Sequence, residues 1–301
     1  PYTTLFRSLG GHGLWDDQAG LYRDEMHLED QNMPLPVRSI VGLLPIAAVE
    51  VLKQSTIDRL PGFKKRMNWF LENRADLARH VSYLKLDTEQ ECSGAHRLLA
   101  IPSEDRLRRA VALMMNESEF LSPFGVRSLS RWHEQHPFTM HMGGASCRVA
   151  YEPGESQSTM FGGNSNWRGP IWLPINYLFI HALRQYGRFY GDRLTVPNPN
   201  ADQGPLTLNQ AADEIASRCL RLFMPSDSGA RPCNQALQTL ADRDGWQDMI
   251  FFHEYFHADT GKGLGASHQL GWTSLIASLL IEGSGAATGP PCDEQPGGRP
   301  K

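Results

Sequence analysis

The chain has 301 residues, of which 41% are hydrophobic, so it is long enough to form one large or two small domains with a sizeable core. Its 29 basic and 33 acidic residues give a formal net charge of -4 and form no long runs. This balance predicts no nucleic-acid or membrane partner and favours a neutral, polar one. No apolar stretch reaches the roughly 18 residues of a membrane span.

The two ends of the chain are set apart from the fold prediction. Residues 1–8, PYTTLFRS, resemble translated sequencing-adapter sequence, and because the chain opens on Pro1 we expect the natural start to lie elsewhere. The Gly- and Pro-rich residues 283–301 predict a disordered tail. The five cysteines include no CxxC pair, which favours a reducing, cytoplasmic location over a disulfide framework.

Apolar residues at helical spacing predict helices along the whole chain. Residues 103–117 also carry a start signal, because Ser103 can cap the helix and acidic residues follow in its first turn. Strand candidates are short, at 21–26 and 147–152, and no strand alternates with a crossover helix. The pattern predicts an all-α fold and disfavours a doubly wound α/β fold. The predicted helices cover 40–54, 63–82, 103–117, 172–189, 207–223, 230–242 and 271–281.

A long connection without helical spacing runs from 118 to 168 and is rich in Gly, Pro, His, Trp and Arg. Long loops inside a compact helical protein are commonly functional, so we expect this one to line or cover a site. PVRSIVGLLP at 36–45 and GVRSLSRW at 125–132 echo each other, each as a loop entering a helix. Two matches do not establish a repeat.

The densest polar and aromatic signal is GGNSNWRGPIWLPINYLFIHAL, at 162–183. It places amide, guanidinium and indole groups at one loop-to-helix junction, a combination that suits hydrogen bonding to sugar hydroxyls and stacking on a sugar face. A structural role fits the same letters, with Trp167 and Trp172 in the core and Arg168 as a buried bridge. The residues predicted here to bind substrate are Asn166, Trp167, Arg168, Gly169, Trp172 and Asn176.

A second signal lies at 253–257, where HEYFH matches the zinc-binding pattern HExxH. On a helix, this spacing would place His253 and His257 one turn apart as ligands, with Glu254 as the base of a zinc metallopeptidase. However, ADTGKGLG follows at once, IFFHEYF fits a short aromatic strand equally well, and no third ligand is evident. We keep the peptidase as an alternative but expect no metal or other cofactor.

Glu254 can also be placed on a short strand, followed by the turn DTGKGLG and a helix that opens at 271–272. This geometry would point a single carboxylate into a pocket rimmed by Trp246 and Trp272. Such a carboxylate can order a water molecule as a general base. The predicted site therefore contains Glu254 as the catalytic residue, with Trp246, His268 and Trp272 binding substrate.

Five segments of the chain together resemble bacterial members of glycoside hydrolase family 63, which includes mannosyl-oligosaccharide glucosidases and is related to the mannosylglycerate hydrolase-like group. The resemblance runs in order from about residue 10 to residue 282, and the combination of NWRGPIW with EYF and GLGASHQLGWT is specific. It implies the C-terminal portion of an (α/α)6 barrel over residues 9–282, with short hairpins and long loops. The five segments are GLWDDQAGLYRDEM, PVRSIVGLLPIAAVE, EFLSPFGVRSLSRWHEQHP, GGNSNWRGPIWLPINYLFI and FFHEYFHADTGKGLGASHQLGWTSLIASLL.

The resemblance also implies a role for Glu254, which matches the family's catalytic base in an inverting hydrolysis of a glycosidic bond. The family's general acid is an Asp upstream of the segment matched here, and Asp16, Asp17 and Asp24 are not assigned that role. We therefore expect a carbohydrate substrate and a missing N-terminal part of the same polypeptide as partner, without which the fragment should be inactive. A non-catalytic carbohydrate-binding or scaffold domain remains a further alternative.

Overall fold

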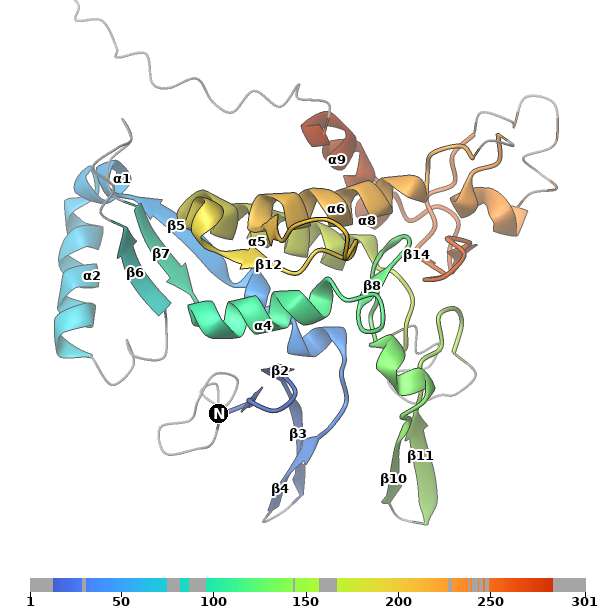
Figure 1. Ribbon diagram of the computed structural model, residues 1–301, viewed down its shortest axis with the longest axis horizontal. Coiled ribbons are helices and arrows are strands. Elements are labelled where there is room, and N and C mark those ends of the chain that lie inside the picture. The colour runs from blue at the N-terminus through green and yellow to red at the C-terminus, as the bar shows by residue number, and fades with distance from the viewer. Residues whose placement is uncertain are drawn as a thin grey trace, which may run out of the picture.

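The computed structural model combines long helices, one small sheet and several hairpins (Figure 1). The adapter-like residues 1–8 lie outside the described residues, and so does the predicted tail beyond Gly283. The structure describes residues 13–28, 31–74, 82–86, 96–142, 144–156, 167–226, 229–237, 239, 243, 246 and 249–283.

Two helices, α5 (Leu173–Tyr190) and α6 (Leu208–Arg221), pack side by side at the centre of the molecule. Helix α6 begins with a capping box in which Thr207 and Gln210 each accept the other's backbone N–H. Helix α5 ends at Gly191, whose φ of 54° lies in the left-handed region that favours glycine. Both elements confirm the helices predicted from the sequence.

Shorter helices surround this pair. The helix α4 (Glu104–Met114) begins as predicted, because Ser103 Oγ accepts the backbone N–H of Arg106 at 3.4 Å. It buries residues at positions i, i+3, i+4 and i+7 against the core. The helices α8 (Leu270–Thr273) and α9 (Leu275–Gly283) contact α5, and α9 also contacts α6. No helix among the described residues has the length and apolar character needed to cross a membrane.

A three-stranded antiparallel sheet stands beside the helices, in the order β5 (Val49–Lys53), β7 (His96–Ala100) and β6 (Ser82–Leu86). Leu98 and Ala100 of the central strand are buried in the main core. Two helices follow β5 along the chain, and they are α1 (Gln54–Asp58) and α2 (Pro61–Asn73).

The prediction of an all-α fold therefore holds only in part. In place of the helix predicted at 40–54, the chain forms the 3-10 turns η1 (Ile40–Gly42) and η2 (Leu44–Ala47) and then strand β5. Proline within η2 lacks the N–H that an α-helix interior needs, and the β-branched valines of β5 pair with β7. Likewise, the described part of 230–242 holds the 3-10 turn η5 (Pro232–Leu237). No sheet of parallel strands occurs among the described residues.

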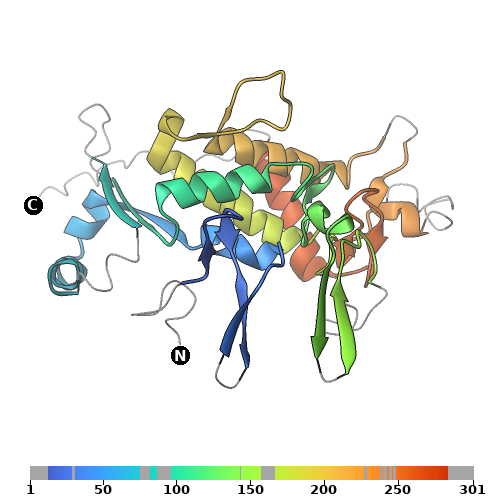
Figure 2. The same cartoon turned by 60° about the horizontal axis from the view of Figure 1, so that its bottom comes forward.

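Six two-stranded hairpins complete the described structure. Figures 1 and 2 show that β3–β4 and β10–β11 extend from the same side of the molecule. The strands predicted at 21–26 and 147–152 are found in shifted form, as β2, β3 and β11. The paired strands are β1 (Trp15–Asp16) with β2 (Leu21–Tyr22), β3 (Asp24–Leu28) with β4 (Gln31–Leu35), β8 (Leu121–Ser122) with β9 (Gly125–Val126), β10 (Phe138–Met142) with β11 (Ala145–Val149), β12 (Thr195–Val196) with β13 (Leu206–Thr207), and β14 (Tyr255–Phe256) with β15 (Gly263–Leu264).

The two segments that echo each other in sequence pair with each other in space. An antiparallel bridge joins Ser39 to Leu129, and the N–H of Ile40 donates to the carbonyl of Ser128 at 2.9 Å. Val37, Leu129 and Val149 form a small apolar cluster separate from the main core. The pairing joins the start of the chain to the middle of the long connection between α4 and α5.

Candidate functional site

The two segments with the strongest sequence signals lie side by side. Ile171, in the loop before α5, forms an antiparallel bridge with Phe256 of β14. The N–H of each residue donates to the carbonyl of the other, at 2.8 and 3.0 Å. Because these two residues are far apart in the chain, the bridge places the predicted sugar-binding junction directly beside the strand that follows Glu254.

Four aromatic side chains from these segments form one continuous stack. The ring of Trp172 lies 4.7 Å from that of Trp167 at an interplanar angle of 9°, and 5.1 Å from that of Tyr255 at 20°. Trp272 lies 5.6 Å from Trp172 at a steeper angle of 57°. Trp167 and Trp272 are 42% and 41% exposed, whereas the two inner rings are buried. The aromatic stack thus has two half-exposed indoles on a buried base.

Glu254 directly precedes Tyr255 of the aromatic stack and is half-buried. Its backbone N–H donates to the carbonyl of Ala266 at 2.9 Å, and its Oε2 accepts the N–H of Ala266 at 3.3 Å. Burial raises the pKa of Tyr255 to about 12, with smaller contributions from the carboxylates of Glu155 and Glu254. The phenol therefore stays neutral beside a carboxylate whose Oε1 accepts no hydrogen bond from any described residue.

The HEYFH segment does not form the helix that a zinc site of the HExxH type requires. Strand β14 pairs with β15 across a turn in which the N–H of His257 donates to the carbonyl of Lys262 at 2.8 Å. Four residues of extended chain span about 13 Å, so His253 and His257 are not one helical turn apart as the HExxH ligands must be. Among the described residues, no cluster of three or more His, Cys, Asp or Glu side chains could hold a metal. The zinc alternative loses its geometric basis.

Two predicted substrate-binding residues serve the scaffold instead. Asn176 is fully buried, and its Oδ1 accepts the N–H of Val126 at 2.7 Å while its Nδ2 donates to the carbonyls of Val126 and Trp172. Arg168 is only 2% exposed, and its Nη1 lies 3.4 Å from Glu152 Oε1. The structure gives Asn176 a scaffold role, so its contact with sugar stays a prediction, and Arg168 fits the buried-bridge alternative.

Gly169 also has a structural reason to be glycine. Its φ is 154°, and a methyl group in place of its hydrogen would lie 2.6 Å from the carbonyl oxygen of Glu152. Its N–H donates to Ser128 Oγ at 3.0 Å. Gly169 thereby allows the junction to pass close to the chain at 151–152.

Trp246 and His268 lie around a different residue. The ring of Phe251 is 6.3 Å from that of Trp246 and 6.0 Å from that of His268. No ring contact within the described residues joins either one to the aromatic stack. The prediction that Trp246 and Trp272 rim one pocket is therefore not supported by direct contact, and Asn166 lies outside the described residues.

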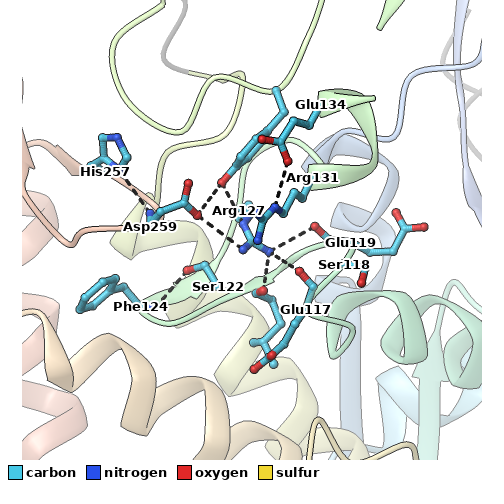
Figure 3. Close-up of polar contacts among 12 residues, drawn as sticks. Glu117, Ser118, Glu119, Ser122, Phe124, Arg127, Arg131, Glu134, His257 and Asp259 are labelled. Atoms are coloured by element: carbon cyan, nitrogen blue, oxygen red, sulfur yellow. Dashed lines mark hydrogen bonds and ion pairs between the residues drawn. The ribbon is translucent and has the colours of Figure 1, made fainter. Parts of the chain in front are cut away.

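Sequence reasoning missed Arg127, whose buried guanidinium ties several segments together (Figure 3). Its Nε donates to Tyr151 Oη at 3.0 Å, and its Nη1 donates to carbonyls of the loop before β9, including that of Glu117 at 3.0 Å. Its Nη2 lies 3.6 Å from Asp259 Oδ1, which also accepts from Tyr151 Oη at 3.1 Å. Burial raises the pKa of Tyr151 well above its ordinary value. The sequence similarity between 36–45 and 125–132, each of which contains an Arg, was the feature that could have drawn attention to Arg127.

A cavity of about 400 Å³ lies next to the junction, between residues that adjoin the hairpins β3–β4 and β10–β11. Val37, Val149 and Trp167 line it together with Arg168 and Asp24, and burial raises the pKa of the Asp24 carboxyl. Its largely apolar wall with a few polar groups is typical of ligand pockets. Glu254 does not line this cavity, so the cavity extends the candidate site without containing its carboxylate.

Comparison with known proteins assigns the chain to a family. The family model of the mannosylglycerate hydrolase MGH1-like glycoside hydrolase domain matches residues 77–273. An uncharacterised Saccharomyces cerevisiae protein, YMR196W, is 41% identical over 272 residues, which make up 89% of this chain and 25% of that protein. The mannosyl-oligosaccharide glucosidase of S. cerevisiae is 26% identical over 179 residues, covering 58% of this chain and 15% of that protein.

A solved structure is also similar, that of a GH63 mannosylglycerate hydrolase from Thermus thermophilus in complex with glucose. It is 16% identical to this chain with a TM-score of 0.36, and the match covers 89% of this chain and 36% of that one. The chain thus spans a quarter or less of the length of the curated relatives that it matches. The family match extends over both the junction and the Glu254 segment, and the chain belongs to the mannosylglycerate hydrolase MGH1-like glycoside hydrolases, within glycoside hydrolase family 63.

Proposed function

We propose that this chain is the base-bearing part of the catalytic domain of an inverting glycoside hydrolase, with Glu254 as the general base. The observation that carries the proposal is the half-buried Glu254 carboxylate, held through Oε2 by the N–H of Ala266 and placed next to the aromatic stack. A carboxylate with one anchored oxygen can use the other to orient and deprotonate a water molecule.

Inverting hydrolysis needs a second carboxyl group, the general acid, about 6.5 to 9.5 Å from the base. Two of the acidic residues near the start of the described chain are engaged elsewhere, because Asp16 pairs with Arg23 and Asp17 with Arg109. Because the family that this chain resembles carries its general acid upstream of the matched segment, we propose that the acid is supplied by another part of the polypeptide. This is consistent with the chain covering only part of its relatives.

The aromatic stack supports a carbohydrate substrate. The half-exposed indoles of Trp167 and Trp272 offer apolar surface of the kind on which the C–H face of a sugar packs. The names of the relatives suggest glucosides of mannosyl-oligosaccharides, or mannosylglycerate, as the compounds to test. Both classes carry a glycosidic bond that a water activated by Glu254 could attack.

The test uses the full-length polypeptide with the substitution Glu254→Gln and a panel of glucosides and mannosides. Gln keeps the shape but cannot accept the proton, so turnover should fall about 10² to 10⁴-fold with little change in substrate affinity. Glu50→Gln serves as the control, because Glu50 is an exposed carboxylate on β5. Nuclear magnetic resonance of the first product should show the inverted anomer.

Two results would contradict the proposal. A folded Glu254→Gln enzyme with the turnover of the Glu50→Gln control would remove the assignment of the base. Product with retained configuration would remove the inverting mechanism. Sugar binding with no turnover by the full-length wild-type protein would favour a non-catalytic carbohydrate-binding domain instead.

A further inference from the structure

His253, the residue before Glu254, is left without a role once the zinc site is discarded. Its side chain is only 2% exposed, and neither ring nitrogen hydrogen-bonds to a residue that the structure describes. Burial, and to a smaller extent His268, lowers its pKa, so the ring is neutral at neutral pH. Its backbone carbonyl accepts the hydroxyl of Thr273 at 2.5 Å. Within the described part of the chain, the ring therefore makes packing contacts, among them with Phe251 and Phe256.

The ring of His253 lies directly against Gly263 of β15. A methyl group in place of the Gly263 hydrogen would lie 2.6 Å from Nε2 of His253 and closer still to its Cδ2. Such a separation is far inside van der Waals contact, so any larger residue at 263 must displace the ring. Glycine is thus required at this position by the ring and not by the backbone conformation.

Gly265 has the corresponding relation to Glu254 itself. A methyl group at Gly265 would lie 2.7 Å from Glu254 Oε2 and 2.7 Å from Tyr255 Cε1. Its φ of 66° adds a backbone preference for glycine. The next residue, Ala266, donates the N–H that holds Oε2. The carboxylate of Glu254 therefore rests on the Gly265 backbone and is anchored immediately beyond it.

We propose that Gly263 and Gly265 are positioning residues for Glu254, the first by seating the His253 ring and the second by leaving room for the carboxylate. The inference rests on the proposed role of Glu254 as the base. Each glycine leaves room for a different side chain, Gly263 for the ring of His253 and Gly265 for the carboxylate of Glu254. A displacement of the carboxylate by about 1 Å is enough to cost about a hundredfold in rate.

The test compares alanine substitutions in the full-length enzyme. Gly265→Ala and Gly263→Ala should each lower kcat at least about tenfold with little change in KM, because substrate contacts remain while the base moves. Gly229→Ala controls for backbone strain, since its φ of 81° is similar but nothing lies within 4 Å of an added methyl group. Gly204→Ala is the matched control for Gly263→Ala. Neither glycine has a φ in the left-handed region, and nothing lies within 4 Å of a methyl group added at Gly204.

Two further measurements separate positioning from a loss of folding. Adding His253→Ala to Gly263→Ala removes the overlapping ring and should recover stability, read from the midpoint of thermal unfolding. In a double-mutant cycle, Gly265→Ala should cause no further loss of turnover on the Glu254→Gln background, because its effect passes through that carboxylate.

The outcomes distinguish the two proposals. If Glu254→Gln is inactive while both glycine variants turn over like their controls, the positioning proposal is wrong and the base assignment stands. Additive losses of turnover in the cycle would also refute positioning. If Glu254→Gln keeps full turnover, the proposed function fails first and the positioning proposal falls with it. If Gly263→Ala fails to fold and the added change His253→Ala does not restore folding, the proposed contact between Gly263 and the His253 ring is wrong.

Discussion

Asn176 offers the sharpest test of the scaffold beneath the site. In the β8–β9 hairpin, Leu121 lies opposite Val126. The N–H of Arg127, the next residue, donates to the carbonyl of Phe120. In an antiparallel pair this pattern means that Leu121 and Val126 share no hydrogen bond. The N–H and the carbonyl of Val126 therefore point away from β8. The side-chain amide of Asn176 satisfies both, at 2.7 and 3.1 Å.

The change Asn176→Ala would leave both backbone groups of Val126 without a partner in a fully buried setting. The carbonyl of Trp172 would lose the side-chain bond but keep the N–H of Asn176 at 3.1 Å. Each orphaned buried group costs about 1 to 3 kcal/mol, so we expect a loss of about 4 kcal/mol in the free energy of unfolding. A space of about one amide adds to that loss.

Urea denaturation of the full-length protein measures this loss directly, with Asn198→Ala as the control. Asn198 is a half-buried asparagine whose Nδ2 donates to the carbonyl of Gly204 at 3.0 Å beside the exposed residues 200–204, so its removal should cost under about 1 kcal/mol. If Asn176→Ala costs no more than the control, the account of Val126 is wrong. If Asn176→Ala weakens sugar affinity and leaves stability unchanged, the result supports the sugar-binding role predicted from the sequence.

Three further predictions concern the site and its surroundings. Arg168→Ala should lower the free energy of unfolding by about 2 to 3 kcal/mol, because it leaves Glu152 beside a buried gap. If the variant loses more free energy of sugar binding than of unfolding, the bridge role is contradicted. Trp272→Ala should weaken substrate binding by about 1 kcal/mol, or about fivefold in KM, whereas Trp69→Ala on α2, which removes another exposed indole, should not. Burial lowers the pKa values of His133, His253 and His257 in the folded protein. The unfolded chain therefore binds protons first, and stability should fall as pH decreases from about 6.5, by at most about 1.4 kcal/mol per pH unit for each histidine, a slope that His133→Gln should reduce.

The parts of the fold that were predictable from the sequence are those set by local residues. Helices α4 and α6 have their own N-caps, at Ser103 and Thr207, and each has a continuous apolar stripe. They can therefore be predicted without knowledge of contacts to distant residues. Strand β5 was not predictable in this way, because its apolar residues continue the run that begins at 40. Its partner β7 lies almost fifty residues further along the chain and decides in favour of a strand.

The same distinction applies within the site. The glycine-rich turn after His257 favoured a short strand for Glu254 over a zinc-binding helix. The strand that forms, β14, begins at Tyr255, one residue after Glu254, and it pairs with β15 inside the segment predicted as a turn. The uses of Asn176 and Arg127 could not be predicted, because their partners are mainly backbone atoms, which no side-chain pattern records. Polar residue types alone therefore overestimated how many groups at the junction are available to a ligand.

The burial of two polar side chains limits which residues of the candidate site can contact a sugar. The amide of Asn176 and the guanidinium of Arg168 are buried within the scaffold, whereas Trp167 and Trp272 are half-exposed and both contact the buried Trp172. Aromatic faces bind by area and shape, and they discriminate poorly between sugars that differ only in the orientation of one hydroxyl. Under the proposed function, selectivity between a glucoside and a mannoside comes from polar groups outside this stack, so exchanging its tryptophans should change the affinity for both test compounds by a similar factor.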